Sequence, residues 1–157
     1  MKSARRRARE LAVQGLYQWQ LNATDPTLIA DDLKATRGFE QADEKHFRGL
    51  LHGVIEHAAD LHVALAPLLD RTVKELSPVE HALLLLSAFE LRDHAQTPYK
   101  VVINEAIELA KSFGGTDGHK YVNAMLNGIA PQLRAPEIAN DRAPSRSLGG
   151  SKGKAAS

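Results

Sequence analysis

The chain has 157 residues, of which 43% are hydrophobic and 25% are charged, and its formal net charge is +1. This size and composition fit one globular domain with a core of its own. The absence of cysteine excludes disulfides, thiolate metal sites and cysteine nucleophiles. No apolar run is long enough to span a membrane, and glutamines interrupt the segment that would have to serve as a secretory signal. We therefore expect a cytoplasmic protein.

The first predicted element is an amphipathic helix with a strongly basic start. Its apolar residues recur at the i, i+3, i+4 spacing of one helix face: Ala8, Leu11, Ala12, Leu16 and Trp19. Arg5, Arg6, Arg7 and Arg9 occupy its first turns. From the helical angle we expect these arginines to lie on the solvent side and not to be buried.

Four guanidinium groups at a helix start oppose the helix dipole. Arginine pairs well with phosphate, and a nucleic acid would convert this repulsion into binding energy through counterion release. An arginine-rich helix is one mode of RNA recognition. The pattern thus favours RNA binding, and the alternative is an ordinary solvated helix start.

A short helix is predicted after Pro26, followed by a long one from Ala42 to about Leu69. The next helix has a complete start signal, with Ser77 as N-cap, Pro78 in the first helical position and Glu80 completing a capping box. Its apolar run predicts a central, buried helix.

Two further helices are predicted, one after Thr97 and Pro98 and one from about His119 to Leu133. No segment has the pattern of a strand, so we expect an all-α bundle of about six or seven helices. Residues 1–134 would form this domain. Residues 135–157 have little to bury and are predicted to be a disordered tail.

The chain lacks the patterns that catalysis or metal binding would require. His52 and Glu56 have the i, i+4 spacing of metal ligands, but no third ligand follows at a suitable spacing. No nucleophile motif, phosphate loop or dinucleotide fingerprint is present. We expect no enzymatic activity, no cofactor and no metal.

Two long motifs, "ARRRARELAVQGLYQWQL" and "PYKVVINEAIELAKSFGGTDGHKYVNAML", closely resemble the signatures of the NusB family of transcription antitermination factors. Their order and spacing also agree, and the resemblance covers residues 2–134. Tyr121 stands where the family often has phenylalanine, and Ala124 where it often has glycine.

The resemblance implies a compact helical fold of two small subdomains. It implies binding of boxA RNA together with NusE, a small-subunit ribosomal protein, to promote antitermination, notably in rRNA operons. The pair would join RNA polymerase with other Nus factors. The implied RNA-binding residues are Lys2, Arg5, Arg6, Arg9, Asp117, Lys120 and Tyr121, and the implied NusE contacts are Tyr17 and Glu80.

Each partner residue has a structural alternative: Tyr17 at the edge of the core, and Glu80 as the capping acid. Tyr121 can likewise be a core-edge residue, and Lys120 a solvated lysine. Alternative functions are an rRNA-binding module related to rRNA cytosine methyltransferases, or a general helical nucleic-acid-binding protein. The sequence leaves open whether the free protein is a monomer or a homodimer.

Overall fold

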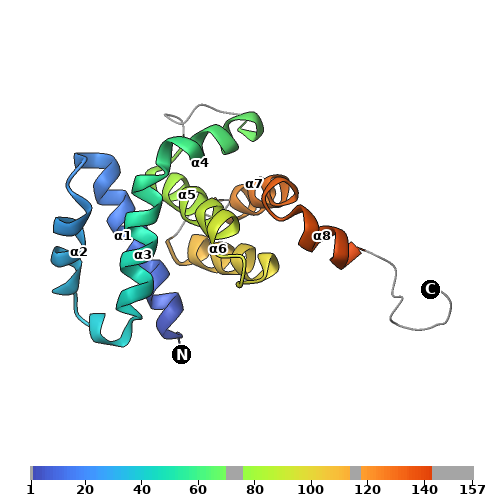
Figure 1. Ribbon diagram of the computed structural model, residues 1–157. Helices are drawn as coiled ribbons and strands as arrows, with labels where there is room; N and C mark the ends of the chain where they lie inside the picture. Colours follow the sequence, from blue (N-terminus) through green and yellow to red (C-terminus); the bar gives the residue numbers. More distant parts are fainter. Residues whose placement is uncertain (1, 70–75, 114–117, 143–157) are drawn as a thin grey trace.

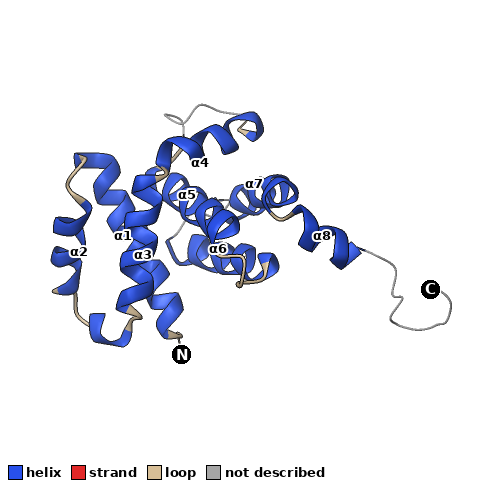
Figure 2. Ribbon diagram, in the orientation of Figure 1, coloured by secondary structure: helices blue, strands red, loops and turns tan. Residues whose placement is uncertain are grey.

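The computed structural model describes residues 2–69, 76–113 and 118–142, and within these ranges the chain is helical and has no strand (Figure 2). The predicted all-α class is confirmed. No helix in the described ranges is long and apolar enough to cross a membrane. The described part of the chain forms eight α-helices and two short 3-10 turns in this order (Figure 1): α1 (Ala4–Asn22), α2 (Pro26–Lys34), η1 (Phe39–Gln41), α3 (Glu44–Glu56), α4 (Ala58–Leu65), η2 (Ala66–Leu68), α5 (Pro78–Asp93), α6 (Tyr99–Phe113), α7 (Gly118–Leu133) and α8 (Ala135–Arg142).

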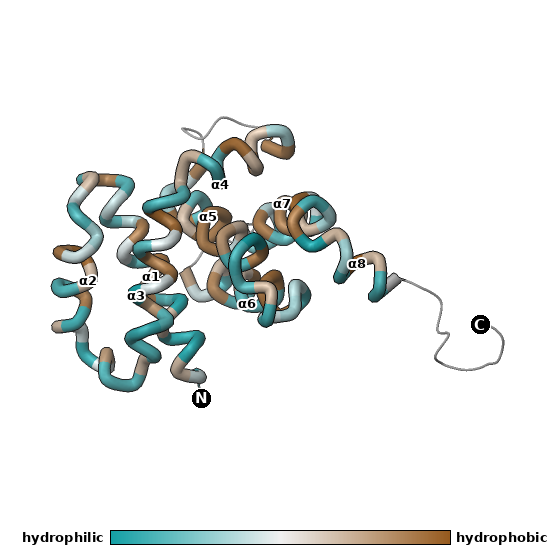
Figure 3. The backbone as a smooth tube through the Cα atoms, viewed as in Figure 1, coloured by the Kyte–Doolittle hydropathy of each residue, from teal (hydrophilic) through white to brown (hydrophobic). Residues whose placement is uncertain are grey.

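Helix α5 forms the centre of the molecule, as its apolar sequence predicts. Its start has the predicted capping box: Ser77 Oγ accepts the Glu80 N–H at 3.0 Å, and the Glu80 carboxylate accepts the Ser77 N–H at 3.4 Å. Every residue from 81 to 91 is buried. Figure 3 shows this hydrophobic helix surrounded by its neighbours. The apolar run therefore acts as the common packing surface for both halves of the chain.

The helices form two groups around α5. Helices α1, α2 and α3 pack on one another in the first group, while α6 and α7 pack with α5 in the second, which α4 also joins. Helices α1 and α3 both contact α5, so α5 belongs to the second group and also closes the core of the first (Figure 1).

A close approach of two helices brings α3 onto α5. A Cβ atom added at Gly53 would lie 2.2 Å from Phe89 Cζ, so only glycine fits without a shift of the phenylalanine ring. The sequence analysis did not identify this contact, because a glycine within a helix gives no sign of the residue it faces.

The long helix predicted from Ala42 to Leu69 is in fact two helices, α3 and α4. The chain turns at His57, whose backbone (φ −106°, ψ 15°) leaves the helical region. Beyond the turn, Leu61 and Leu65 are buried in the core. The apolar spacing continues through the turn, and neither proline nor glycine marks it, which explains the error.

The prediction of a disordered tail from residue 135 onward is wrong for residues 135–142, which form α8. Ile138 is only 6% exposed and joins the core. Glu137 accepts the backbone N–H of Tyr99 at 2.9 Å, which ties α8 to the start of α6. One apolar side chain and one carboxylate suffice to dock this short helix, so composition alone does not reveal it. Residues 143–157 lie outside the described residues.

Candidate nucleic-acid and partner interfaces

The first turn of α1 presents exposed basic side chains. Ser3 caps the helix by accepting the Arg6 N–H at 3.0 Å, and no acidic residue lies in the first turn. Lys2 makes an ion pair with Glu10, and Arg5 lies 3.5 Å from the Asp43 carboxylate with 53% of its side chain exposed. Exposed ion pairs of this kind contribute little to stability and are easily exchanged for another anion.

Arg6 is paired with a carboxylate of the same chain. Its Nε and Nη2 donate to the two carboxylate oxygens of Glu105 on α6, at 3.0 and 2.7 Å. These hydrogen bonds and the charge of Arg6 lower the pKa of Glu105 against the opposing effect of burial. One third of the Arg6 side chain remains exposed.

Arg9 contradicts the expectation that all four arginines lie on the solvent side. It is 5% exposed, and its Nε and Nη2 donate to the Glu90 carboxylate on α5 at 2.9 and 2.8 Å. Burial lowers the pKa of Arg9, but the hydrogen bonds and charge of Glu90 outweigh it, so the net shift is upward. Arg9 thus joins α1 to α5 through a bidentate pair.

A second buried arginine binds the C-terminal end of α5. Arg134 is 5% exposed and donates to the backbone carbonyls of Leu91 at 2.6 Å and His94 at 2.8 Å. Carbonyls at a helix C-terminus have no partner within the helix, and a cation there also suits the dipole. Arg134 Nη1 also makes an ion pair with Glu137 Oε1 at 2.6 Å.

The start of α7 is the second predicted RNA-binding region. Lys120 is exposed, whereas Tyr121 is half-buried and its ring packs against the core. The structure is therefore compatible with a stacking role for Tyr121 and also with the core-edge alternative. Asp117 lies outside the described residues, and the RNA roles of Lys120 and Tyr121 remain predictions.

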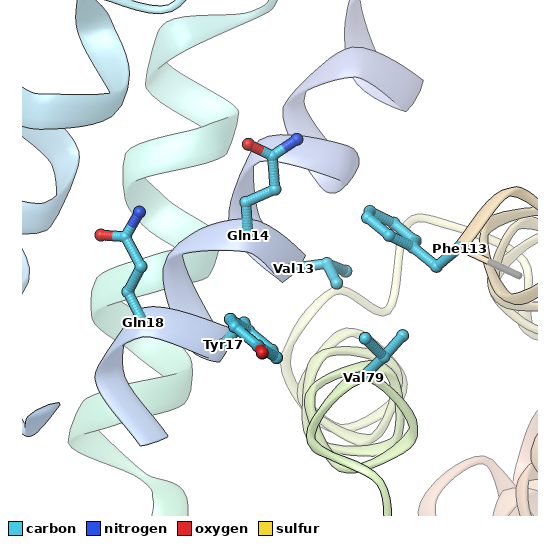
Figure 4. Close-up of a pocket in the computed structure, with 6 residues that line it drawn as sticks. All are labelled: Val13, Gln14, Tyr17, Gln18, Val79 and Phe113. Atoms are coloured by element: carbon cyan, nitrogen blue, oxygen red, sulfur yellow. The ribbon is translucent and has the colours of Figure 1, made fainter. Parts of the chain in front are cut away.

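A groove of about 470 Å³ runs between α1, the start of α5 and the end of α6 (Figure 4). Tyr17, which is 40% exposed, lines it together with Val79 and Phe113. Val13, Gln14 and Gln18 complete the α1 side. This groove, the α1–α5 groove below, combines apolar rings and methyl groups with amide side chains. Sequence analysis identified Tyr17 but not Val79 or Phe113.

Glu80 lies in an adjoining cleft of about 260 Å³, which shares Val79 and Phe113 with the α1–α5 groove and reaches Gly118 at the start of α7. The two predicted partner residues, Tyr17 and Glu80, thus line neighbouring parts of one surface. Glu80 serves as the capping acid as well, so its structural role is established and its partner role remains a prediction.

Histidines meet at the opposite end of α1, in a contact that the sequence analysis missed. The Nε2 atoms of His62 and His81 face each other, and His81 Nδ1 contacts Gln20 Oε1 at 2.9 Å. Gln20 Nε2 donates to the Pro78 carbonyl at 3.0 Å, which fixes the amide so that His81 Nδ1 carries the proton. Burial, with the nearby His62, lowers the pKa of His81 to about 4.

The candidate metal ligands from the sequence do not assemble into a site. His52 and Glu56 lie on α3, and the described residues contain no group of three or more histidine, aspartate or glutamate side chains that could hold a metal ion.

Comparisons with known proteins assign the family. The model of the NusB family matches residues 6–131. The chain is 56% identical over 137 residues to the transcription antitermination protein NusB of Paraburkholderia phytofirmans, covering 87% of this chain and 95% of that protein. It is 57% identical over 141 residues to the namesake protein of Ralstonia nicotianae, covering 90% of this chain and 91% of that one.

Solved structures agree. NusB of T. maritima has a TM-score of 0.75 and 27% identity, covering 88% of this chain and 99% of that one. A chain from a complex of antitermination factors NusB and NusE with double-stranded RNA has a TM-score of 0.76 at 22% identity, covering 84% of this chain and 99% of that one, and it shows the shared fold. The relatives are transcription antitermination proteins, the family that the two sequence motifs indicate. From the family match and the identity of these relatives it follows that the chain is a member of the NusB family of transcription antitermination proteins.

Proposed function

We propose that this protein binds boxA-type RNA through the basic start of α1 and the start of α7, and binds NusE in the α1–α5 groove. The complex promotes antitermination in the cytoplasm, notably in rRNA operons, and joins RNA polymerase with other Nus factors. Family membership supports this role, and a solved complex of NusB and NusE with RNA has the same fold.

One observation carries the proposal: a single helix supplies both surfaces. Lys2, just before the Ser3 cap of α1, and Arg5, in its first turn, have exposed charges that can contact phosphate. Three turns further on, the same helix presents Tyr17 to the groove. RNA and protein partner can therefore bind together on one rigid element.

The groove has the chemistry of a protein-binding surface. Tyr17 and Phe113 provide aromatic area, which is enriched at the centre of such interfaces. Glu80 adds a carboxylate at the edge, which suits a basic ribosomal protein such as NusE.

The predicted RNA-binding basic residues differ in the protein contacts that they must give up to bind RNA. Lys2 and Arg5 exchange an exposed ion pair for a phosphate, which costs little. Arg6 must share or leave Glu105, and Arg9 must leave a buried partner. We assign direct contact first to Lys2 and Arg5, then to Arg6, with Lys120, Tyr121 and Asp117 on the α7 side.

Fluorescence anisotropy with a labelled single-stranded boxA RNA tests the function. Addition of NusE is expected to tighten binding at least several-fold. With about four phosphate contacts, the logarithm of the association constant should fall against log salt with a slope of roughly −3. Equal binding to duplex DNA of the same length, or no effect of NusE, would contradict the proposal.

A matched pair of variants tests the groove. Tyr17→Ala removes an exposed ring inside it, and Leu21→Ala removes an exposed apolar side chain of α1 outside it. Only Tyr17→Ala should weaken NusE binding, by about tenfold or more, as expected for a central aromatic contact. Equal effects of the two variants would place NusE elsewhere.

A further inference from the structure

A small cleft separates α1 from the loop that joins α2 to η1. Its volume is about 110 Å³, and Arg7 and Gln14 line it from α1, with Thr36, Arg37 and Gly38 from the loop. This is too small for a nucleoside or cofactor pocket, which occupies several hundred Å³. Two of its polar side chains are guanidinium groups, and the Gln14 amide and Thr36 hydroxyl can also donate hydrogen bonds.

Arg7 is distinguished by what it lacks. Within the described ranges, Arg5, Arg6 and Arg9 each face a carboxylate, whereas the Arg7 side chain makes no ion pair or hydrogen bond there. Arg37 is exposed and likewise makes none within those ranges. The cleft thus holds two guanidinium groups whose charge is not balanced by a protein partner.

Among the described residues one carboxylate, that of Glu10, borders the cleft, and in the free protein it pairs with Lys2. When Lys2 turns to a phosphate of the RNA, Glu10 still supplies only one negative charge against the two guanidinium groups. The local charge therefore remains positive and favours an anion.

The loop that carries Arg37 is held in a defined position. Gly38 takes a left-handed conformation (φ 86°) that favours glycine. Phe39 is 6% exposed and packs edge-to-face on Phe47 at 5.7 Å between ring centroids. The Phe39 N–H donates to the Thr36 carbonyl at 3.0 Å. A buried anchor directly beside Arg37 limits the entropy that an ordered contact would lose.

We propose that Arg7 and Arg37 together bind one backbone phosphate of the RNA that lies along α1. Planar guanidinium groups bind phosphate oxygens in bidentate fashion, and two of them can clamp a single phosphate from either side. This rests on the proposed RNA-binding function and extends the RNA path from α1 to the α2–η1 loop.

The test compares two double variants in the same anisotropy assay. Arg7→Ala/Arg37→Ala removes the clamp. Arg48→Ala/Arg92→Ala removes the same charge from arginines that are paired with acids elsewhere, on α3 and α5. The clamp variant should bind boxA RNA about tenfold more weakly near physiological salt, with a slope flattened by about 0.7, because the two arginines hold one phosphate. The control should keep the wild-type slope.

Conservative and competing probes complete the experiment. Arg7→Lys/Arg37→Lys keeps the charges and should restore most of the slope, while the lost bidentate geometry leaves binding weaker than wild type. If the alanine clamp variant and its control bind RNA alike, the inference is wrong and the proposed function stands. If the wild-type protein does not bind RNA, both are wrong. A further outcome would also overturn the inference. If the wild-type protein binds inorganic phosphate more tightly than chloride at equal ionic strength, while the clamp variant binds RNA as the wild type does, the cleft holds a free anion and not an RNA phosphate.

Discussion

Arg5 and Arg9 lie one helical turn apart on α1, and their surroundings are opposite. Arg5 has 53% of its side chain exposed and makes a single 3.5 Å ion pair with Asp43, whereas Arg9 is buried in a bidentate pair with Glu90. The fold is destabilised when a buried charge lacks its partner, whereas an exposed charge remains available to a ligand. Under the proposed function, the basic start of α1 combines two roles, docking of the helix and contact with RNA, and these can be separated experimentally.

The largest expected effect is that of Arg9→Ala. Removing Arg9 leaves the Glu90 carboxylate buried without its bidentate partner, which should lower the free energy of unfolding by about 3–5 kcal/mol. Arg5→Ala should change it by less than about 0.5 kcal/mol. Urea unfolding followed by circular dichroism measures both. Similar stabilities of the two variants would show that the Arg9–Glu90 pair does not hold α1 on α5.

Truncation after Arg134 should have the next largest effect. It removes Ile138 from the core and Glu137 from both Arg134 and the start of α6. Loss of the buried isoleucine alone should lower stability by about 1.5–3 kcal/mol.

Truncation after Arg142 serves as the control for this experiment, because it leaves α8 in place. We propose that residues 143–157 do not contribute to the fold, so this shorter deletion should leave the melting temperature unchanged. An equal melting temperature for both truncations would mean that α8 does not stabilise the domain.

Acidic pH should weaken the fold before carboxylates titrate. Burial lowers the pKa of His81 and of His46 to about 4, against 6.5 for an unperturbed histidine. Between these values the unfolded chain binds protons that the folded protein does not, so stability falls as pH decreases from about 6.5 towards 4. Thermal melts at pH 7 and pH 5 should show a drop of several degrees, which His81→Gln should reduce. His52→Gln, a partly exposed histidine on α3, should leave the drop unchanged.

Local features of this fold could be predicted from the sequence. The capping box at Ser77 and Glu80 depends on residues three positions apart, and the apolar stripe of α1 depends on one helix. The resemblance to NusB then supplied the function, which no spacing of residues shows by itself.

Long-range contacts could not be predicted in this way. Arg9 and Glu90 are 81 positions apart, and a long arginine side chain at the edge of a stripe can turn towards either solvent or protein. A signal was present nonetheless: Glu90 follows an apolar run on a central helix, and a buried acid requires a cation.

The salt dependence of RNA binding tests the division of the arginines most directly, with Arg5→Ala compared to Arg9→Lys under conditions in which both are folded. Arg5→Ala should bind boxA RNA about fourfold more weakly near physiological salt and flatten the slope by about 0.7, the loss of one phosphate contact. Arg9→Lys should keep the wild-type slope, even though its unfolding free energy is lower. A wild-type slope for Arg5→Ala, or a flattened slope for Arg9→Lys, would contradict the assignment of Arg5 to RNA and Arg9 to the fold.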